Sequence, residues 1–322
     1  MRHVPTFETL PPPSAAPAAD DFAASVIEGL SRPQKTLPCR FFYDARGSAL
    51  FEEITQLPEY YPTRTEIGIL EGCAAEIVEG FAKGDVLVEF GSGSSLKTEI
   101  LLDRIADRVT YVPLDVSEAA LADATERLQA RYPALEIRPL LADFSNLSKF
   151  PEEFSGSRRT GFFPGSTIGN LAPNDAVNLL SNFRKVLGER GRLIIGVDLK
   201  KDPRVLISAY NDSAGITGAF NLNLLARINR ELAGTFNLAA FQHRALYNPR
   251  AGRIEMHLVS LRAQDAVAAG RRFHFVEGET IHTENSYKYT VPEFRQLAAK
   301  AGWKPNRLWT DDREQFSVHE LI

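Results

Sequence analysis

The clearest indication of the fold comes from eight consecutive residues, Val86-Leu87-Val88-Glu89-Phe90-Gly91-Ser92-Gly93. The first five form a short, mainly apolar run, which predicts a buried strand. The last three form a glycine-rich turn, and the residues from Leu96 to Ala106 have helical apolar spacing. In open α/β sheets, ligands lie beyond the carboxyl ends of the strands. This stretch therefore predicts a ligand-binding turn between a buried strand and a helix.

The same turn narrows the class of ligand. Two glycines separated by one residue occur in nucleotide-binding proteins of several kinds, so the pair alone is a weak signal. The dinucleotide fingerprint also requires Gly or Ala three positions after the second glycine, and Leu96 occupies that position. A nicotinamide-dependent oxidoreductase is therefore an alternative that Leu96 disfavours, and an adenosine ligand without a pyrophosphate fits better.

Outward from this turn, strands and helices alternate along the chain. Strands are predicted at 109–114, 137–141, 160–163 and 192–197, and helices at 117–131 and 174–187. A helix at 291–301 and strands at 307–310 and 316–321 end the chain. Alternation on this scale predicts a parallel sheet with right-handed crossovers and helices on both faces.

A second group of elements precedes and interrupts this alternation. Helices are predicted at 20–30, 48–57, 203–210 and 218–232, and strands near 241–247, 253–261, 271–275 and 280–289. Asn248 to Gly252 has the composition of a hairpin connection. A helix to about Phe81 is expected to begin at Thr63-Arg64-Thr65-Glu66, where Thr63 and Glu66 have capping-box spacing. The α/β half therefore contains an insertion of a different kind.

Composition excludes several classes of function. The 322 residues include 37 basic and 41 acidic side chains, for a formal net charge of −4, which argues against nucleic acid or an anionic membrane as partner. The two cysteines, Cys39 and Cys73, form no disulfide framework or metal pattern, so a reducing cytoplasm is expected. The six histidines are scattered, and no metal site is expected. No apolar run approaches the roughly 20 residues that span a bilayer.

Polar residues follow the next two predicted strands. Asp115 ends the second strand, where a carboxylate accepts both hydroxyls of a ribose. Asp143-Phe144 follows the third strand, where an acid beside an aromatic ring suits an adenine. Lys97 opens the first crossover helix. Solvated turn acids and, for Lys97, an exposed surface lysine are the alternatives that the pattern leaves open.

The fourth strand ends in a turn rich in small and polar residues, Gly165-Ser166-Thr167-Ile168-Gly169-Asn170-Leu171. A buried asparagine at such a tip orients a carboxylate or an amine, because its amide has donor and acceptor atoms. The alternative is that Asn170 only caps the helix that follows. This turn is therefore a candidate site for an acceptor substrate.

With further motifs, these features make the chain resemble the histidine-specific, S-adenosylmethionine-dependent methyltransferases of ergothioneine biosynthesis, which produce hercynine. The resemblance extends from about Ser31 to Ile322. The further motifs are Phe42-Tyr43-Asp44 with Gly47-Ser48, Leu57-Pro58-Glu59-Tyr60-Tyr61-Pro62-Thr63-Arg64, Tyr210-Asn211-Asp212 running into Gly215, Phe220-Asn221, Asn229-Arg230-Glu231-Leu232 and Ile254-Glu255-Met256. It implies an α/β fold: a class I methyltransferase (Rossmann-like) sheet with a second, smaller α+β substrate-binding domain.

The resemblance also implies domain boundaries, a cofactor and a partner. Residues 1–19 are expected to be a disordered N-terminal segment, residues 20–64 and 201–288 the substrate-binding domain, and residues 65–200 and 289–322 the methyltransferase domain. The expected cofactor is S-adenosyl-L-methionine. The expected partner is a small-molecule amino acid, L-histidine, with no nucleic acid and no membrane, and the protein is expected to be a cytoplasmic monomer.

Site residues follow from the same resemblance. It places cofactor contacts at Gly91, Lys97, Asp115, Asp143 and Phe144. It places the amine and carboxylate of the amino acid near Tyr60, Asn170 and Tyr210, with Tyr43 and Gly165 close by, and the imidazole at Glu284 and Ser286, with Met256 beneath the ring. No dedicated base is evident, and Tyr60 or an ordered water is the candidate acceptor for the released proton.

Glu284-Asn285-Ser286 favours histidine as the substrate on physical grounds. Residues two apart on a strand point to the same face, so Glu284 and Ser286 are able to contact one ligand. A carboxylate accepts an imidazole N–H, and a hydroxyl donates to the other ring nitrogen or accepts from it. Two solvent-facing polar residues on an edge strand are the alternative. Asn285, Tyr287 and Tyr289 depart from the family pattern nearby, which leaves the fine substrate preference open.

Methyl transfer from a sulfonium to a neutral α-amine needs mainly positioning. Three rounds would give a trimethylammonium group, to which Tyr43, Tyr60, Tyr61 and Phe220 offer aromatic faces. Two further alternatives stay open: N-methylation of another amino acid or a biogenic amine, and a non-catalytic adenosine-ligand binding protein.

Overall fold

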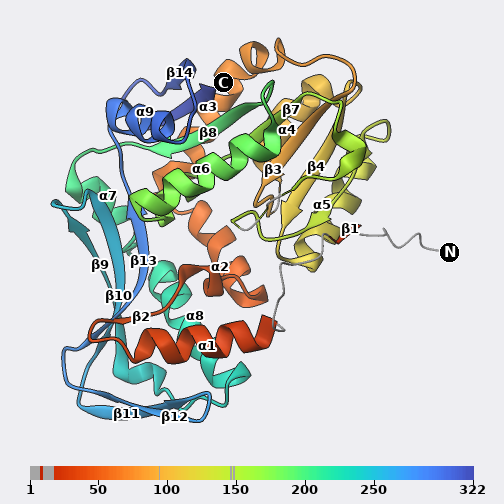
Figure 1. Cartoon of the computed structure of the whole chain (residues 1–322). Helices are drawn as coiled ribbons and strands as arrows, with labels where there is room; N and C mark the ends of the chain where they lie inside the picture. The colour runs from red at the N-terminus through yellow and green to blue at the C-terminus, as the bar shows by residue number, and fades with distance from the viewer. Residues whose placement is uncertain (1–7, 10–17, 94, 146, 148) are drawn as a thin grey trace.

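The computed structural model describes residues 8–9, 18–93, 95–145, 147 and 149–322. Their strands form a nine-stranded sheet, a four-stranded sheet and a two-stranded hairpin. Figure 1 shows the large sheet with its helices in one lobe, and the smaller sheet and the hairpin in the other. Most of the segment predicted to be disordered, residues 1–19, lies outside the described residues. Within it, Glu8–Thr9 forms the short strand β1.

The large sheet has the order β1-β6-β4-β3-β7-β8-β15-β14, with β5 beside β4. Strands β3, β4, β6, β7 and β8 are parallel, and β15 is antiparallel to β8 and β14. The strands are β3 (Asp85–Phe90), β4 (Val109–Asp115), β5 (Glu136–Ile137), β6 (Leu140–Leu141), β7 (Arg159–Phe163), β8 (Arg192–Asp198), β14 (Pro305–Thr310) and β15 (Phe316–Leu321). The strand order reverses between β3 and β7, which is where open α/β sheets bind ligands. The predicted Rossmann-like fold class is confirmed.

Successive side chains of the buried strands point to opposite faces, so the large sheet has an apolar core on each face. Leu87 of β3 packs with α3 (Tyr61–Val78), α4 (Leu96–Ile105) and α5 (Glu118–Arg131). Its neighbours Val86 and Val88 pack on the other face with α6 (Pro173–Leu187) and α9 (Val291–Lys300). Since both faces are covered, the strands read as continuous apolar runs, as in other parallel sheets.

The four-stranded sheet has the order β2-β13-β10-β9 and its own apolar core. Its strands are β2 (Lys35–Thr36), β9 (Phe241–Asn248), β10 (Arg253–Ser260) and β13 (Thr280–Tyr287), and the hairpin is β11 (Gln264–Ala268) with β12 (Arg271–Phe275). The helices of this lobe are α1 (Ala18–Leu30), α2 (Ala45–Thr55), α7 (Pro203–Ala209) and α8 (Ile216–Glu231). The 3₁₀ turns among the described residues of both lobes are η1 (Cys39–Phe42), η2 (Glu152–Phe154), η3 (Thr167–Asn170) and η4 (Leu238–Ala240). The separate core supports the domain boundaries given above, which stay a prediction. No helix in the described ranges is long and apolar enough to cross a membrane.

The start of α3 differs from the prediction. The helix begins at Tyr61 and has Pro62 in its first turn, where the missing N–H of proline costs no hydrogen bond. Glu66 therefore lies inside the helix and caps nothing. Its buried carboxylate binds Gly165 and Lys97 instead, so the capping-box interpretation of Thr63 and Glu66 was wrong.

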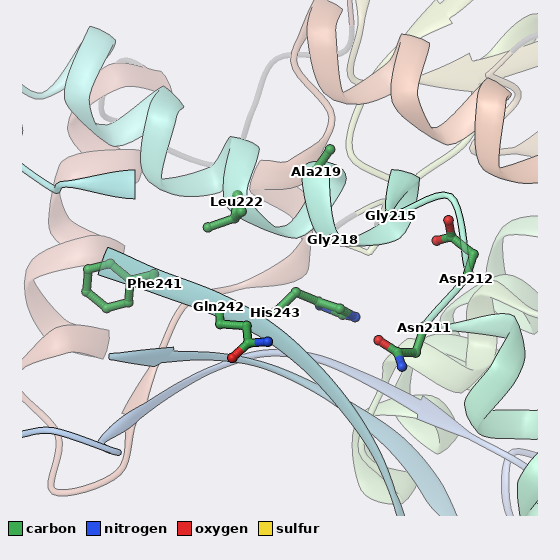
Figure 2. A pocket seen from close by; sticks show the side chains of 9 residues that line it. All are labelled: Asn211, Asp212, Gly215, Gly218, Ala219, Leu222, Phe241, Gln242 and His243. Atoms are coloured by element: carbon green, nitrogen blue, oxygen red, sulfur yellow. The ribbon is translucent and has the colours of Figure 1, made fainter. Parts of the chain in front are cut away.

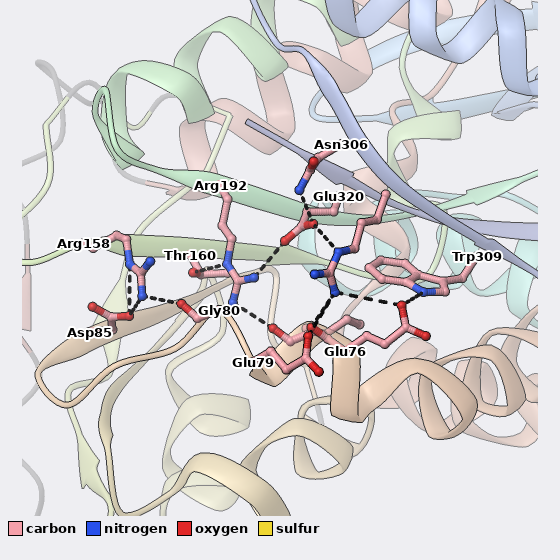
Figure 3. A network of polar contacts seen from close by, with 12 residues as sticks. Glu76, Glu79, Gly80, Asp85, Arg158, Thr160, Arg192, Asn306, Trp309 and Glu320 are labelled. Carbon is pink, nitrogen blue, oxygen red and sulfur yellow. Dashed lines mark hydrogen bonds and ion pairs between the residues drawn. The ribbon is translucent and has the colours of Figure 1, made fainter.

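A buried ionic network lies at the amino ends of β3, β7 and β8 (Figure 3). Arg192, the first residue of β8, donates to Thr160 Oγ1 at 3.0 Å, to Glu320 Oε1 at 2.8 Å and to Ile77 O at 3.0 Å. This is the end of the sheet opposite the glycine turn. Because ligands bind at the carboxyl ends, we interpret the network as structural: it joins α3 to the central strands.

Candidate active site

Glycine geometry shapes the turn after β3. Gly91 has a φ of +71° and Gly93 a φ of +48°, in the left-handed region that favours glycine. A Cβ atom on Gly91 would lie 3.1 Å from the ring of Phe144. The glycine therefore allows the close approach of Phe144, and the structure brings together two residues that the sequence places at the cofactor.

Asp115 is fixed beside the same turn. Its Oδ2 accepts a hydrogen bond from Gly93 N at 2.9 Å, and its Oδ1 accepts one from Ser117 N at 3.0 Å. Asp143 follows the neighbouring strand β6 and accepts from Ser145 N at 2.8 Å. Both carboxylates thus lie near the carboxyl ends of adjacent parallel strands, the edge at which a ligand is expected.

A buried network beneath the turn was missed by the sequence interpretation. Tyr111 OH donates to Glu89, and Ser95 Oγ lies 2.9 Å from Tyr111 OH. Burial raises the pKa of Glu89 to about 7, although hydrogen bonds from Thr98 and Tyr111 lower it. The network supports Ser95, whose φ of +55° is unusual for a residue with a side chain. The available signal was a single acid inside the apolar run 86–90.

Glu66 links the cofactor side of the site to the tip of β7. It is 1% exposed. Its Oε2 accepts from Gly165 N at 2.8 Å and from Lys97 Nζ at 2.6 Å. Lys97 is therefore not a free surface lysine: it is held by a buried carboxylate next to Gly165. The predicted role of Glu66 as a capping residue was different, because the contact with Gly165 depends on the fold bringing α3 to the end of β7.

Glu284, Ser286 and Met256 share one face of the small sheet. Met256 pairs with Glu284, and Ile254 pairs with Ser286, across the antiparallel strands β10 and β13. Met256 and Ile254 belong to the apolar core of this lobe. The shared face therefore points inward, so Glu284 and Ser286 do not form a solvent-facing pair on an edge strand.

A β-bulge decides which residues of β13 point inward. The register of β10 and β13 shifts between Met256 and His257, which leaves Thr283 as the extra residue. As a result, His282 stacks on His257 on the outer face, with ring centroids 4.6 Å apart. His282 and Glu284 are two residues apart, yet they lie on opposite faces.

Tyr210, which follows α7, reaches the same inward face. Its hydroxyl lies 2.7 Å from Ser286 Oγ. Lys288, 2% exposed, donates to both hydroxyls. Lys288 was not among the expected site residues, because a single lysine at the end of a strand resembles an exposed terminus.

Aromatic rings extend this group toward α2. Tyr210 contacts Tyr60 at 6.2 Å between ring centroids, Tyr60 contacts Phe51 at 6.3 Å, and Phe51 contacts Tyr43 at 5.7 Å. Phe220 lies within 6.1 Å of Phe51 and 5.8 Å of Tyr43. We call these five residues the aromatic cluster. Phe51 was missed because its helical spacing resembles that of an ordinary core residue.

Asn170 approaches from the large lobe. The residue that caps α6 is Ala172, so Asn170 is not a helix cap. A Cβ atom on its neighbour Gly169 would lie 2.8 Å from Tyr287 O. The turn η3, which ends at Asn170, therefore packs directly on β13, the strand that carries Ser286.

Two of the three residues that depart from the family pattern, Asn285 and Tyr287, lie elsewhere. Asn285 pairs with Glu255, and Tyr287 pairs with Arg253, on the outer face of the sheet. The Tyr287 hydroxyl accepts from Arg253 at 2.5 Å. Neither side chain therefore shares the face of Glu284 and Ser286.

The outer face also holds the one group of potential metal ligands within the described ranges. Atoms of Glu255, His257 and His282 lie within 4.8 Å of one another. The two imidazoles are stacked at 19°, so their in-plane lone pairs run nearly parallel and do not converge on an ion. Arg253 Nη2 also lies 2.6 Å from Glu255 Oε1. This arrangement fits a packed polar face better than a metal site.

Burial sets the protonation of the inward face. Burial raises the pKa of Glu284 to about 7, while the charge of Lys288 lowers it. Burial, followed by the nearby Tyr210 and Glu284, raises the pKa of Tyr60 well above its usual range. A phenolate at Tyr60 is therefore scarce at neutral pH, which disfavours this residue as a base.

An open pocket of about 420 Å³ lies beside the Tyr210 backbone (Figure 2). His243, at its wall, donates through Nε2 to Tyr210 O at 2.8 Å and accepts through Nδ1 from Asn221 at 2.9 Å. Asp212 accepts from Ile216 N at the start of α8. None of the expected site residues lines this pocket. Its polar side chains fix the segment that carries Tyr210.

Comparison with known proteins agrees with this geometry. The family model of histidine-specific, S-adenosylmethionine-dependent methyltransferases matches residues 22–322. The chain is 42% identical over 311 residues to histidine N-alpha-methyltransferase of Mycolicibacterium smegmatis, a match that covers 95% of this chain and 96% of that protein. It is 40% identical over 300 residues to histidine N-alpha-methyltransferase of Mycobacterium tuberculosis, with 91% and 92% covered. It is 32% identical over 311 residues to ergothioneine biosynthesis protein 1 of Neurospora crassa, with 92% and 34% covered. This chain belongs to the histidine-specific, S-adenosylmethionine-dependent methyltransferase family.

Proposed function

We propose that this enzyme transfers methyl groups from S-adenosylmethionine to the α-amino group of L-histidine and gives hercynine after three rounds, the first step of ergothioneine biosynthesis. One observation carries the choice of substrate. Glu284 and Ser286 share the inward face of β13 with Met256 opposite, and Tyr210 OH lies 2.7 Å from Ser286 Oγ. A carboxylate beside a hydroxyl matches the two nitrogens of an imidazole.

The residues around the glycine turn fit the cofactor. Gly91 lets the ring of Phe144 pack against the turn, and Asp115 is held at the turn by Gly93 N. S-adenosylmethionine supplies an electrophilic methyl group on a sulfonium. We assign the ribose hydroxyls to Asp115, the adenine to Asp143 and Phe144, and further cofactor contacts to Gly91 and Lys97.

For the amino acid, we assign the imidazole N–H to Glu284 and the other ring nitrogen to Ser286, with Met256 beneath the ring. Tyr60, Asn170 and Tyr210 hold the amine and the carboxylate, with Tyr43 and Gly165 nearby. Such a site rejects phenylalanine or leucine, because Glu284 and Ser286 would be left unpaired. Discrimination of this kind reaches on the order of 10⁴.

Catalysis here is mainly positioning. The α-amine of a free amino acid has a pKa above the value of about 8 for a peptide amino terminus. Only a small fraction is therefore neutral at physiological pH, and this fraction is the nucleophile. The aromatic cluster offers ring faces to the cationic, methylated amine. An ordered water is the better candidate for the released proton, since burial keeps Tyr60 protonated. We further propose a cytoplasmic monomer, a location that the two free cysteines support.

Mass spectrometry of histidine incubated with the full-length enzyme and S-adenosylmethionine tests this function. The expected result is the successive addition of one, two and three methyl groups. Tryptophan, tyrosine and a biogenic amine serve as parallel substrates. Methylation of one of these without methylation of histidine would overturn the substrate assignment. Cofactor binding without any transfer would favour a non-catalytic adenosine-binding protein.

Glu284→Ala tests the role of the carboxylate. The variant is expected to lose histidine binding and to keep cofactor binding, because Glu284 lies on the small sheet, away from the glycine turn. Titration calorimetry measures both affinities. Equal loss of both would refute the assigned role.

A further inference from the structure

Lys288 is a buried lysine that the proposed function does not use. It lies two residues after Ser286, so the two side chains share the inward side of the chain. Its ammonium donates to Ser286 Oγ at 2.8 Å, to Tyr210 OH at 3.0 Å and to Asp198 at 2.7 Å. An ammonium has three N–H donors and no acceptor. All three donors are therefore used, two of them on hydroxyls of the substrate site.

The number of available protons limits the directions in which the hydroxyls of Tyr210 and Ser286 form hydrogen bonds. A hydroxyl has one proton and two acceptor positions. Lys288 fills one acceptor position on Tyr210 and one on Ser286, and it cannot accept a proton from either. The two hydroxyls are 2.7 Å apart, so one O–H bridges them and the other is left for a ligand. An amino acid that offers two acceptor atoms would recruit both O–H groups.

Asp198 pairs with the same ammonium of Lys288. Its fully buried carboxylate also accepts from Tyr61 OH at 2.8 Å and from Lys201 Nζ at 2.5 Å. Although burial opposes ionisation, Lys288 and Lys201 hold the pKa of Asp198 below its usual value. These four residues come from the three segments through which the chain passes between the lobes, near residues 61, 198–201 and 288. We call them the hinge cluster.

The hinge cluster is also unbalanced in charge. The cluster contains two ammonium groups, those of Lys201 and Lys288, and one carboxylate, that of Asp198. The cluster is therefore suited to neighbouring anions. Glu284, whose pKa the charge of Lys288 lowers, is one, and the carboxylate of an amino acid next to Tyr210 would be another.

We propose that Lys288 is a positioning residue: by donating to both Tyr210 and Ser286, it keeps their hydroxyls as hydrogen-bond donors toward the amino acid. Tyr210 then donates to the substrate carboxylate. Ser286 donates to the unprotonated ring nitrogen, while Glu284 accepts from the ring N–H. The site thereby selects the neutral imidazole over the imidazolium ion, which has no lone pair for Ser286. This inference rests on the proposed function.

Lys288→Met tests the inference. The variant keeps most of the length of the side chain and removes the donors. Asp198 keeps Lys201 and Tyr61 as partners, so the substitution leaves no buried carboxylate unpaired. Lys200→Met is the matched control, since Lys200 pairs with Glu293 and is 34% exposed at its side chain. The measurements are KM and kcat for histidine methylation, the cofactor Kd and the melting temperature.

The expected result is a rise in KM for histidine of roughly 10- to 100-fold, because hydrogen bonds from a charged donor are lost, with a smaller change in kcat and an unchanged cofactor Kd. In a Tyr210→Phe/Ser286→Ala background, Lys288→Met should add less than about threefold, because residues that act through one another are not additive. Lys288→Gln serves if the Met variant does not fold, since its amide oxygen accepts a hydroxyl proton and gives the same loss.

Three outcomes would overturn the inference. KM for histidine could stay unchanged in Lys288→Met, or it could rise by the same factor in both backgrounds. In these two cases the wild-type enzyme still methylates histidine, so the proposed function stands. If the wild-type enzyme methylates no histidine, the proposed function and this inference both fail.

Discussion

Glu284 shows how one half-buried side chain connects recognition to pH. Burial raises its pKa to about 7. Its carboxylate, the form that accepts an imidazole N–H strongly, is therefore present above pH 7 and is lost as the pH falls through that value. Because kcat/KM reports the pKa values of the free enzyme, the enzyme's own titration should be visible in this parameter.

We therefore expect the ratio of kcat/KM for histidine between the wild-type enzyme and Glu284→Gln to be largest above pH 7. At pH values below 7 the ratio should decrease, by up to tenfold per pH unit. The glutamine amide does not titrate, and the titrations of the substrate are common to both enzymes, so they cancel. Steady-state rates between pH 5.5 and 8.5 measure the ratio. A ratio that stays constant over this range would contradict the assigned pKa and the role of the carboxylate.

At the scale of elements, β8 and α3 meet through a glycine. A Cβ atom on Gly196 of β8 would lie 1.9 Å from Glu66 Oε1. The glycine therefore lets α3 approach the sheet closely enough for Glu66 to bind Gly165 N and Lys97.

Gly196→Ala should displace the Glu66 carboxylate, lower the stability by about 1 to 3 kcal/mol through overpacking and weaken cofactor binding through Lys97. Gly72→Ala in α3 is the control: nothing lies within 4 Å of the added methyl group, and alanine in a helix should stabilise by roughly 0.5 to 1 kcal/mol. Chemical denaturation and cofactor calorimetry measure both effects. An unchanged cofactor affinity in a folded Gly196→Ala would separate Glu66 from the cofactor site.

At the scale of the whole molecule, stability and ligand binding are placed at opposite ends of the large sheet. The Arg192 network lies at the amino ends of the strands, and the glycine turn lies at the carboxyl ends. Arg192 and Glu320 are 9% and 5% exposed at their side chains, so removal of one partner leaves a charge buried.

Glu320→Ala is therefore expected to lower the free energy of unfolding by about 3 to 5 kcal/mol, with little effect on cofactor affinity in the folded enzyme. Arg32→Ala is the comparison, because the Arg32–Glu28 pair is exposed and such pairs contribute about 0 to 1 kcal/mol. Denaturation monitored by circular dichroism gives both values. A loss as small as that of Arg32→Ala would show that the network is not structural.

Local patterns determined much of this protein. The apolar run 86–90 with its glycine turn, the alternation of strands and helices, and the Glu-x-Ser pair on β13 depend on neighbours in sequence, and their periodicity is visible without a fold. Motif resemblance then placed the acids at the strand ends, and the family match confirms the chemistry.

Tertiary structure alone decided the rest, because the deciding contacts join residues far apart in sequence. The bulge at Thr283 turns Glu284 inward and His282 outward, and it is set by pairing with β10. Glu66 looked like a helix cap until α3 was placed against the tip of β7. Lys288 and Asp198 are 90 residues apart, and a buried ammonium is stable there only because the fold supplies its carboxylate.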